Sequence, residues 1–62
     1  MSKDAIILAL RDLAEYHTLI ADEFRDTAAH AVGDPRKDME RSEARHRDFT
    51  VAMQEAIELL TP

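Results

Sequence analysis

The sequence contains no cysteine and no tryptophan, and only one glycine and two prolines among its 62 residues. The lack of cysteine excludes disulfide bonds and a thiol nucleophile, and it is typical of proteins from a reducing compartment. A single glycine is too few for a loop that cradles phosphate groups. Long apolar runs are also missing, because Arg11 and Asp12 interrupt the first hydrophobic stretch, so we expect no membrane span and no signal segment. These absences favour a cytoplasmic protein that is not an enzyme.

The short length limits the core that one chain can build. A chain of about 60 residues buries only roughly 60% of the surface that its unfolded form exposes. Small scaffolds without disulfides usually gain stability from a metal or from oligomerisation. Apolar residues make up 45% of the sequence, which is too much for a disordered chain. We therefore expect a folded protein that depends on a partner copy or a metal.

The formal net charge of -5 makes nucleic acid an unfavourable partner, because phosphate binding depends on an excess of lysine and arginine. Basic residues are concentrated between Arg36 and Arg47, but acidic residues alternate with them there. Glu43 and Arg47 have the spacing and order of a favourable helical ion pair. This pattern predicts a solvated face with many salt bridges.

One segment, Gly33-Asp34-Pro35, carries the signals of a turn between two helices. Glycine is suited to the left-handed conformation that closes a helix, aspartate to capping the next helix, and proline to its first position. The sequence predicts an all-α fold with one helical-hairpin domain over residues 1–62. Its helices are expected at about 3–32 and 35–60, joined by a turn at 33–34. Ser2 is expected to cap the first helix.

Both predicted helices carry a seam of residues at alternating spacings of four and three, as helices that pack in heptads do. The two seams consist of Ile6, Leu10, Leu13, His17, Ile20, Phe24, Thr27 and Ala31, and of Met39, Ser42, His46, Phe49, Met53, Ala56 and Leu60. If the chain reverses at Gly33, the seams pair in layers whose residue numbers always add to the same total. His17 then lies level with Phe49, and Ile20 with His46.

Further apolar residues flank the seams, so two helices alone cannot cover them. In the first helix these are Ile7, Ala14, Ala21 and Ala28, and in the second Ala52, Ile57 and Leu59. The pattern predicts an antiparallel homodimer that forms a four-helix bundle. The expected interface residues are Leu10, Leu13, His17, Ile20, Phe24, His46, Phe49 and Met53.

His17 and His46 occupy seam positions that normally hold aliphatic residues. One interpretation is that they are buried polar residues that set the register of the bundle. A two-fold axis could also place His17 of one chain in the layer of His46 of the other, which would bring four imidazoles to the centre. The second interpretation is therefore a metal site.

Glu43-Ala44-Arg45-His46 places a carboxylate and an imidazole on one helical face, and Glu23 lies level with Glu43. At these residues the chain resembles a ferritin-like hairpin. The resemblance implies iron or another transition metal held by Glu23, Glu43 and His46, with His17 as a further ligand. It covers few residues, and Ile20 stands level with His46 where such proteins have an inward glutamate.

Leu8 and Leu19 are expected to face away from the seam, about three helical turns apart, and are candidates for a docking surface. Together these features predict a small acidic module that binds itself and another protein. Its function would be that of a regulator or inhibitor of the kind that bacteria and phages encode. The alternative is the ferritin-like metal-binding bundle.

Overall fold

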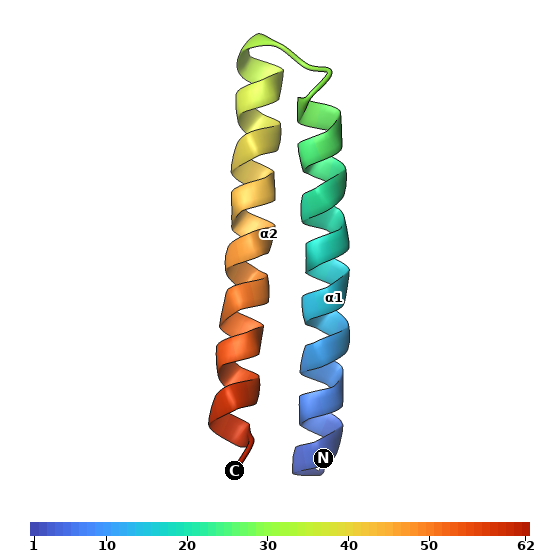
Figure 1. Cartoon of the computed structure of the whole chain (residues 1–62), viewed down its shortest axis with the longest axis vertical. Coiled ribbons are helices and arrows are strands. Elements are labelled where there is room, and N and C mark those ends of the chain that lie inside the picture. The colour runs from blue at the N-terminus through green and yellow to red at the C-terminus, as the bar shows by residue number, and fades with distance from the viewer.

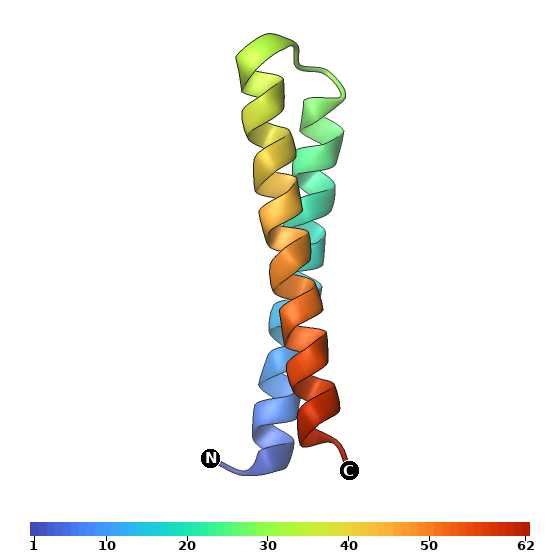
Figure 2. The same ribbon diagram turned by 90° about the vertical axis from the view of Figure 1, so that its left-hand side faces the viewer.

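The computed structural model describes all 62 residues and consists of two long helices. Helix α1 spans Lys3–Ala28 and α2 spans Gly33–Leu60. The two helices run antiparallel and side by side, with both termini at one end and the connection at the other (Figures 1 and 2). The Cα atoms extend over 45 × 15 × 14 Å, so the molecule is a rod. The prediction of an all-α hairpin is confirmed.

The start of α1 follows the predicted capping pattern. Ser2 has an extended backbone, and its side-chain oxygen accepts a hydrogen bond from the backbone N–H of Ala5 at 3.1 Å. This bond satisfies one of the N–H groups that have no partner in the first turn of a helix. Asp4 lies in the same turn, where a negative charge complements the positive end of the helix dipole.

The connection differs from the prediction, because α1 ends at Ala28 and the chain crosses to α2 through residues 29–32. The backbone N–H groups of His30 and Ala31 donate to carbonyls three residues earlier, which tightens the end of α1. Val32 is then extended, with φ -136° and ψ 160°. The first helix is therefore four residues shorter than predicted, because these residues are needed to cross between the helix axes.

Gly33 has the predicted left-handed conformation, with φ +67°, but it opens α2 and does not close α1. No side chain caps the start of α2, so the capping bond predicted for Asp34 is not formed. Asp34 lies within the first turn of α2, where its carboxylate still complements the helix dipole.

The two helices pack along small residues. Ala14, Ala21, Ala28 and Thr50 are the four buried residues of the chain, and Ala21 has no exposed surface at all. The three alanines recur every seven residues, so they form one line along α1. Small side chains on this line let the helices approach closely. The prediction had placed the alanines beside the contact and the larger seam residues in it, and the structure reverses these positions.

The larger seam residues lie to one side of the alanine line. A helix turns about 100° per residue, which places the α1 seam at about 40–120° from the direction of α2. The seam of α2 is displaced from Thr50 by similar angles and in the same sense of rotation. Because the two helices run in opposite directions, this rotation brings both seams to the same side of the hairpin. Leu13 and Phe49 consequently keep 45% and 43% of their surface exposed. We call this side the open face; it consists of Ile6, Leu10, Leu13, His17, Ile20 and Phe24 with Ser42, His46, Phe49, Met53, Ala56 and Leu60.

The predicted register agrees with the contacts between the helices. The rings of His17 and Phe49, which were expected in one layer, lie 5.2 Å apart between centroids. Thr50 contacts residues of α1 on both sides of its predicted level, the backbone carbonyl of Ala14 and the hydroxyl of Thr18. The pairing of residues along the two helices therefore agrees with the prediction, although the rotation of each helix about its own axis differs from it.

Replacement of Gly33 tests the turn. A Cβ atom at this position would meet no other atom within 4 Å, so only the backbone conformation opposes a side chain. Gly33→Ala should lower the free energy of unfolding by about 1–2 kcal/mol, the usual penalty of a left-handed residue. Gly33→Asn should lose less, because asparagine tolerates this region. Urea unfolding measures both, and an alanine variant as stable as the parent would contradict this account.

Replacement of Ala21 tests the close packing of the helices. Leucine at this fully buried position would push the helices apart, so Ala21→Leu should cost about 1–3 kcal/mol of stability. Ala9→Leu provides the matched control, because Ala9 lies in the same helix and is exposed. Thermal unfolding followed by circular dichroism compares the two variants. Equal melting temperatures would show that small residues do not set the helix spacing.

Candidate functional site

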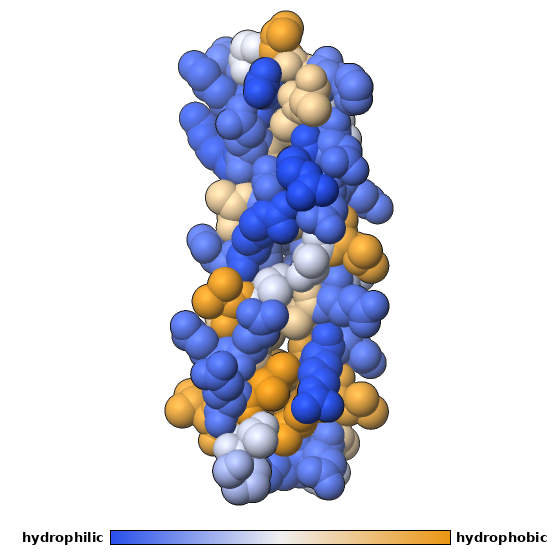
Figure 3. All heavy atoms as spheres, viewed as in Figure 1, coloured by the Kyte–Doolittle hydropathy of each residue, from blue (hydrophilic) through white to orange (hydrophobic).

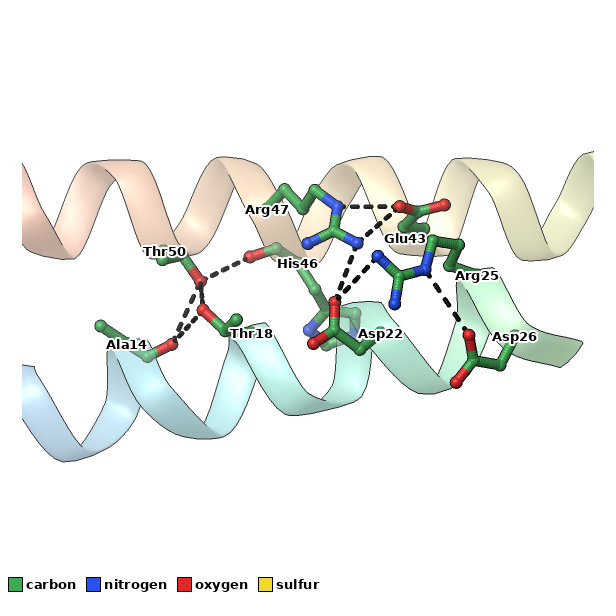
Figure 4. A network of polar contacts seen from close by, with 9 residues as sticks. All are labelled: Ala14, Thr18, Asp22, Arg25, Asp26, Glu43, His46, Arg47 and Thr50. Atoms are coloured by element: carbon green, nitrogen blue, oxygen red, sulfur yellow. Dashed lines mark hydrogen bonds and ion pairs between the residues drawn. The ribbon is translucent and has the colours of Figure 1, made fainter. Parts of the chain in front are cut away.

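The two sides of the hairpin differ in chemistry. Figure 3 shows the side that faces the viewer in Figure 1: hydrophilic residues dominate its upper and middle parts, and apolar residues gather near the end that holds both termini. Figure 4 shows the polar contacts that connect the helices. The open face lies on the opposite side of the line of contact, by the helical angles given above. We call the side seen in Figure 3, which carries these polar contacts, the polar side, although apolar residues cover part of its lower end.

A network of ion pairs centred on Arg47 joins the helices on the polar side (Figure 4). The guanidinium of Arg47 donates to Glu43 of the same helix, with a shortest N–O distance of 2.7 Å, and to Asp22 of α1 at 3.1 Å. Arg25 lies within 3.7 Å of Asp22 and 3.5 Å of Asp26. The hydrogen bond that Arg47 donates to Glu43, followed by the one that it donates to Asp22, raises the pKa of Arg47 above its usual value. The predicted pair of Glu43 and Arg47 is present, and Asp22 extends it to α1.

A second group of polar contacts lies at the buried threonine (Figure 4). The Thr50 hydroxyl lies 3.2 Å from the carbonyl oxygens of both Ala14 and His46, and it can donate to either. The Thr18 hydroxyl donates to the Ala14 carbonyl at 2.9 Å and lies 3.2 Å from the Thr50 hydroxyl. Sequence reasoning missed both threonines, because a threonine that bonds a carbonyl four residues back fits an exposed position equally well.

His17 and His46 meet within one chain. Their Nδ1 atoms are 2.7 Å apart, and the ring centroids are 5.0 Å apart with an angle of 26° between the ring planes. The centroid distance exceeds the nitrogen distance by about two ring radii, so the rings face each other edge to edge through these nitrogens. One Nδ1 must carry a proton and donate it, while the other accepts. Both imidazoles are half-buried at the inner border of the open face.

Aromatic rings surround the histidine pair. Phe49 lies 5.2 Å from His17 and 6.0 Å from His46 between centroids, and Phe24 lies 5.8 Å from His46. Tyr16 contacts the edge of His17 at 5.5 Å. Such surroundings exclude water from part of each imidazole. The pair therefore lies in the middle of a mostly apolar surface.

The predicted ferritin-like ligand set does not assemble within one chain. Glu43 is paired with Arg47 on the polar side, and Glu23 is exposed. Glu23 lies two residues after the buried Ala21, which turns its side chain away from α2. No group of three or more histidine or acidic side chains is close enough to hold a metal ion. Of the four residues proposed as ligands, the structure brings together only His17 and His46.

Leu8 and Leu19 face outward, as predicted, with 60% and 57% of their surface exposed. At 100° per residue, both leucines are rotated away from Ala14 in the direction opposite to the seam, so they lie on the polar side of α1 and not on the open face. Leu19 also borders an open hollow of about 450 Å³, whose polar lining includes Arg11, Glu15 and Gln54. These two leucines are thus separate from the apolar surface around the histidines.

Comparison with protein-family models, with curated proteins and with solved structures finds no match to this chain. Neither helix contains an apolar stretch of the length that crossing a membrane requires.

The Arg47 network can be tested by replacement of its central residue. Arg47→Ala should lower the melting temperature at pH 7 more than Arg41→Ala does, because Arg41 pairs only with Asp38 of its own helix. Because the pKa of Arg47 is raised, the difference in melting temperature between the parent and Arg47→Ala should persist as the pH rises above 7 and should be lost only in strong alkali. Equal melting temperatures for the two alanine variants would contradict a role for Asp22 in joining the helices.

Proposed function

We propose that the chain acts as a homodimer in which two open faces pack together into an antiparallel four-helix bundle. The observation that carries this proposal is the lack of a core: no large side chain of the single hairpin is fully buried. Ordering a residue costs about 1–2 kcal/mol of backbone entropy alone, and the single hairpin sets against this only four buried residues and a group of half-buried apolar ones. A second copy would cover the apolar side chains that the first leaves exposed.

The size of the open face suits this partner. The Cα atoms of the whole hairpin extend over 45 Å by 15 Å, so one side of it covers about 700 Å² before side chains are added. A standard stable interface buries roughly 800 Å² on each partner. A full overlap of two hairpins therefore reaches the usual range. The polar side is an unsuitable alternative for this contact, because its carboxylates and arginines would have to be desolvated.

The function that this arrangement supports best is that of a small, acidic, non-enzymatic protein-interaction module. In the dimer both polar sides remain outside, and each carries Leu8 and Leu19 as exposed apolar residues. An acidic surface with a few exposed leucines suits another protein better than nucleic acid. We place the protein among cytoplasmic regulators or inhibitors of bacterial or phage type, with itself and a second protein as partners.

If the proposed dimer is correct, an aspartate on the open face of α1 should prevent dimerisation, and an aspartate on the polar side should not. Sedimentation equilibrium at micromolar concentration should give a dimer for the parent and a monomer for Leu13→Asp. The aspartate would be buried without a partner in two symmetric copies, so dimer affinity should fall by more than about a hundredfold. Leu8→Asp is the matched control, because Leu8 is equally apolar but lies on the polar side, and it should leave the dimer intact.

A parent protein that sediments as a folded monomer at these concentrations would overturn the proposal. Loss of the dimer in Leu8→Asp, with a dimer in Leu13→Asp, would show that the opposite side forms the interface.

A further inference from the structure

We infer that the centre of the dimer is a transition-metal site formed by His17 and His46 of both copies. This inference rests on the proposed homodimer, because one chain supplies only two imidazoles. The metal would belong to the borderline divalent cations that imidazole binds well, Zn²⁺, Co²⁺, Ni²⁺ and Cu²⁺. It differs from a ferritin-like site in using no carboxylate.

The position of the pair along the rod supports the inference. The midpoint of α1 falls between Glu15 and Tyr16, and that of α2 between His46 and Arg47. The histidine pair therefore lies in the middle of the rod. If the two-fold axis is perpendicular to two fully overlapping rods, it passes through their middle. If the axis runs along the rods, each residue lies at the same height as the same residue of the other copy. In both arrangements, the histidines of one copy lie level with those of the other.

The direction of the side chains points to the same place. In a square four-helix bundle, the central axis lies at about 45° from the direction of the neighbouring helix. Ala14 and Thr50 mark that direction, because they are buried between α1 and α2. His17 is displaced from Ala14 by about 60° toward the open face, and His46 from Thr50 by about 40°. Both imidazoles are therefore directed toward the axis of the bundle.

The chemistry of the pair fits a cation. Two imidazole nitrogens 2.7 Å apart already face each other with their lone pairs or shared proton between them. In tetrahedral zinc sites, nitrogens at about 2.0–2.1 Å from the metal are about 3.3 Å from one another. The pair would have to open by about half an ångström, and the donor imidazole would have to carry its proton on Nε2 instead of Nδ1, so that both Nδ1 lone pairs are free for the metal. Two such pairs would complete four-coordination.

The surroundings favour a nitrogen-only site. Phe24 and Phe49 lie beside the imidazoles, and the carboxylates of Asp22 and Glu43 are engaged with Arg47 on the polar side of the hairpin. A cation at the centre would replace the hydrogen bond of each histidine pair with metal bonds. The histidines would otherwise stay as polar groups inside an apolar interface, where they lower stability unless they are fully satisfied.

Metal binding is tested on the full chain after treatment with a chelator. Calorimetric titration with ZnCl₂ should give one zinc per two chains, and CoCl₂ should produce the intense visible absorption of tetrahedral Co²⁺. His46→Gln should weaken zinc binding by at least about a hundredfold, since it removes two of four ligands. His30→Gln is the matched control, because His30 is exposed beside the turn, and it should bind zinc like the parent.

Sedimentation in EDTA and in zinc separates this inference from the dimer. The protein can be a dimer in EDTA and yet bind no zinc or bind one zinc per chain, and either result overturns the metal site and leaves the dimer standing. The same holds if the His46→Gln variant binds zinc with the affinity of the parent. A monomer under both conditions overturns both. A dimer that forms only with zinc supports both. Should His46→Gln lose its helical circular dichroism, His17→Gln repeats the test, and the stoichiometry and cobalt spectrum of the parent decide independently of either variant.

Discussion

The close contact along Ala14, Ala21 and Ala28 of α1 governs the rest of the molecule. Alanine side chains allow the two helix axes to approach, and Thr50 fills the remaining space with a hydroxyl that finds a carbonyl acceptor. Small side chains bury little apolar area, however, and the hydrophobic effect is roughly proportional to that area. The contact thus determines the geometry of the hairpin while contributing only a small part of the stability that a folded chain needs.

A direct consequence is the separation of the large apolar side chains from the contact. Leu13 and Phe49 cannot turn toward the sister helix, because the alanine line occupies that direction. They are displaced to one side, where both helices present apolar residues. On the other side, Arg47 joins Asp22 and Glu43 in a network that stays partly hydrated, with 39% of the arginine side chain exposed. Ion pairs of this kind contribute little to stability. Their effect is to leave the opposite side as the surface that a second copy can cover.

The histidine pair lies on the open face, next to the line of contact between the helices. His17 and His46 satisfy each other through one hydrogen bond, which lets two polar rings occupy an aromatic surrounding without an unpaired buried group. A shared proton is the simplest way to satisfy the pair within one chain. A cation shared with a second copy would satisfy four imidazoles at once. The proposed dimer and the proposed metal site therefore answer the same question, which is why histidines replace aliphatic residues at the centre of an apolar face.

Periodicity and turn chemistry were enough to predict the all-α hairpin, the cap at Ser2, the left-handed Gly33 and the level at which His17 meets Phe49. Each of these depends on spacing along the chain or on the conformational preference of one residue. The rotation of each helix about its axis could not be predicted in this way. The alanine line and the heavier seam are adjacent and both apolar, so either could have faced the sister helix.

The tertiary structure decided this rotation through packing, since only the alanines permit the close approach. That rotation brought His17 to His46 within one chain and turned Glu23 outward. The structure also decided the end of α1 at Ala28, because the distance between the axes determines how many residues the crossing takes.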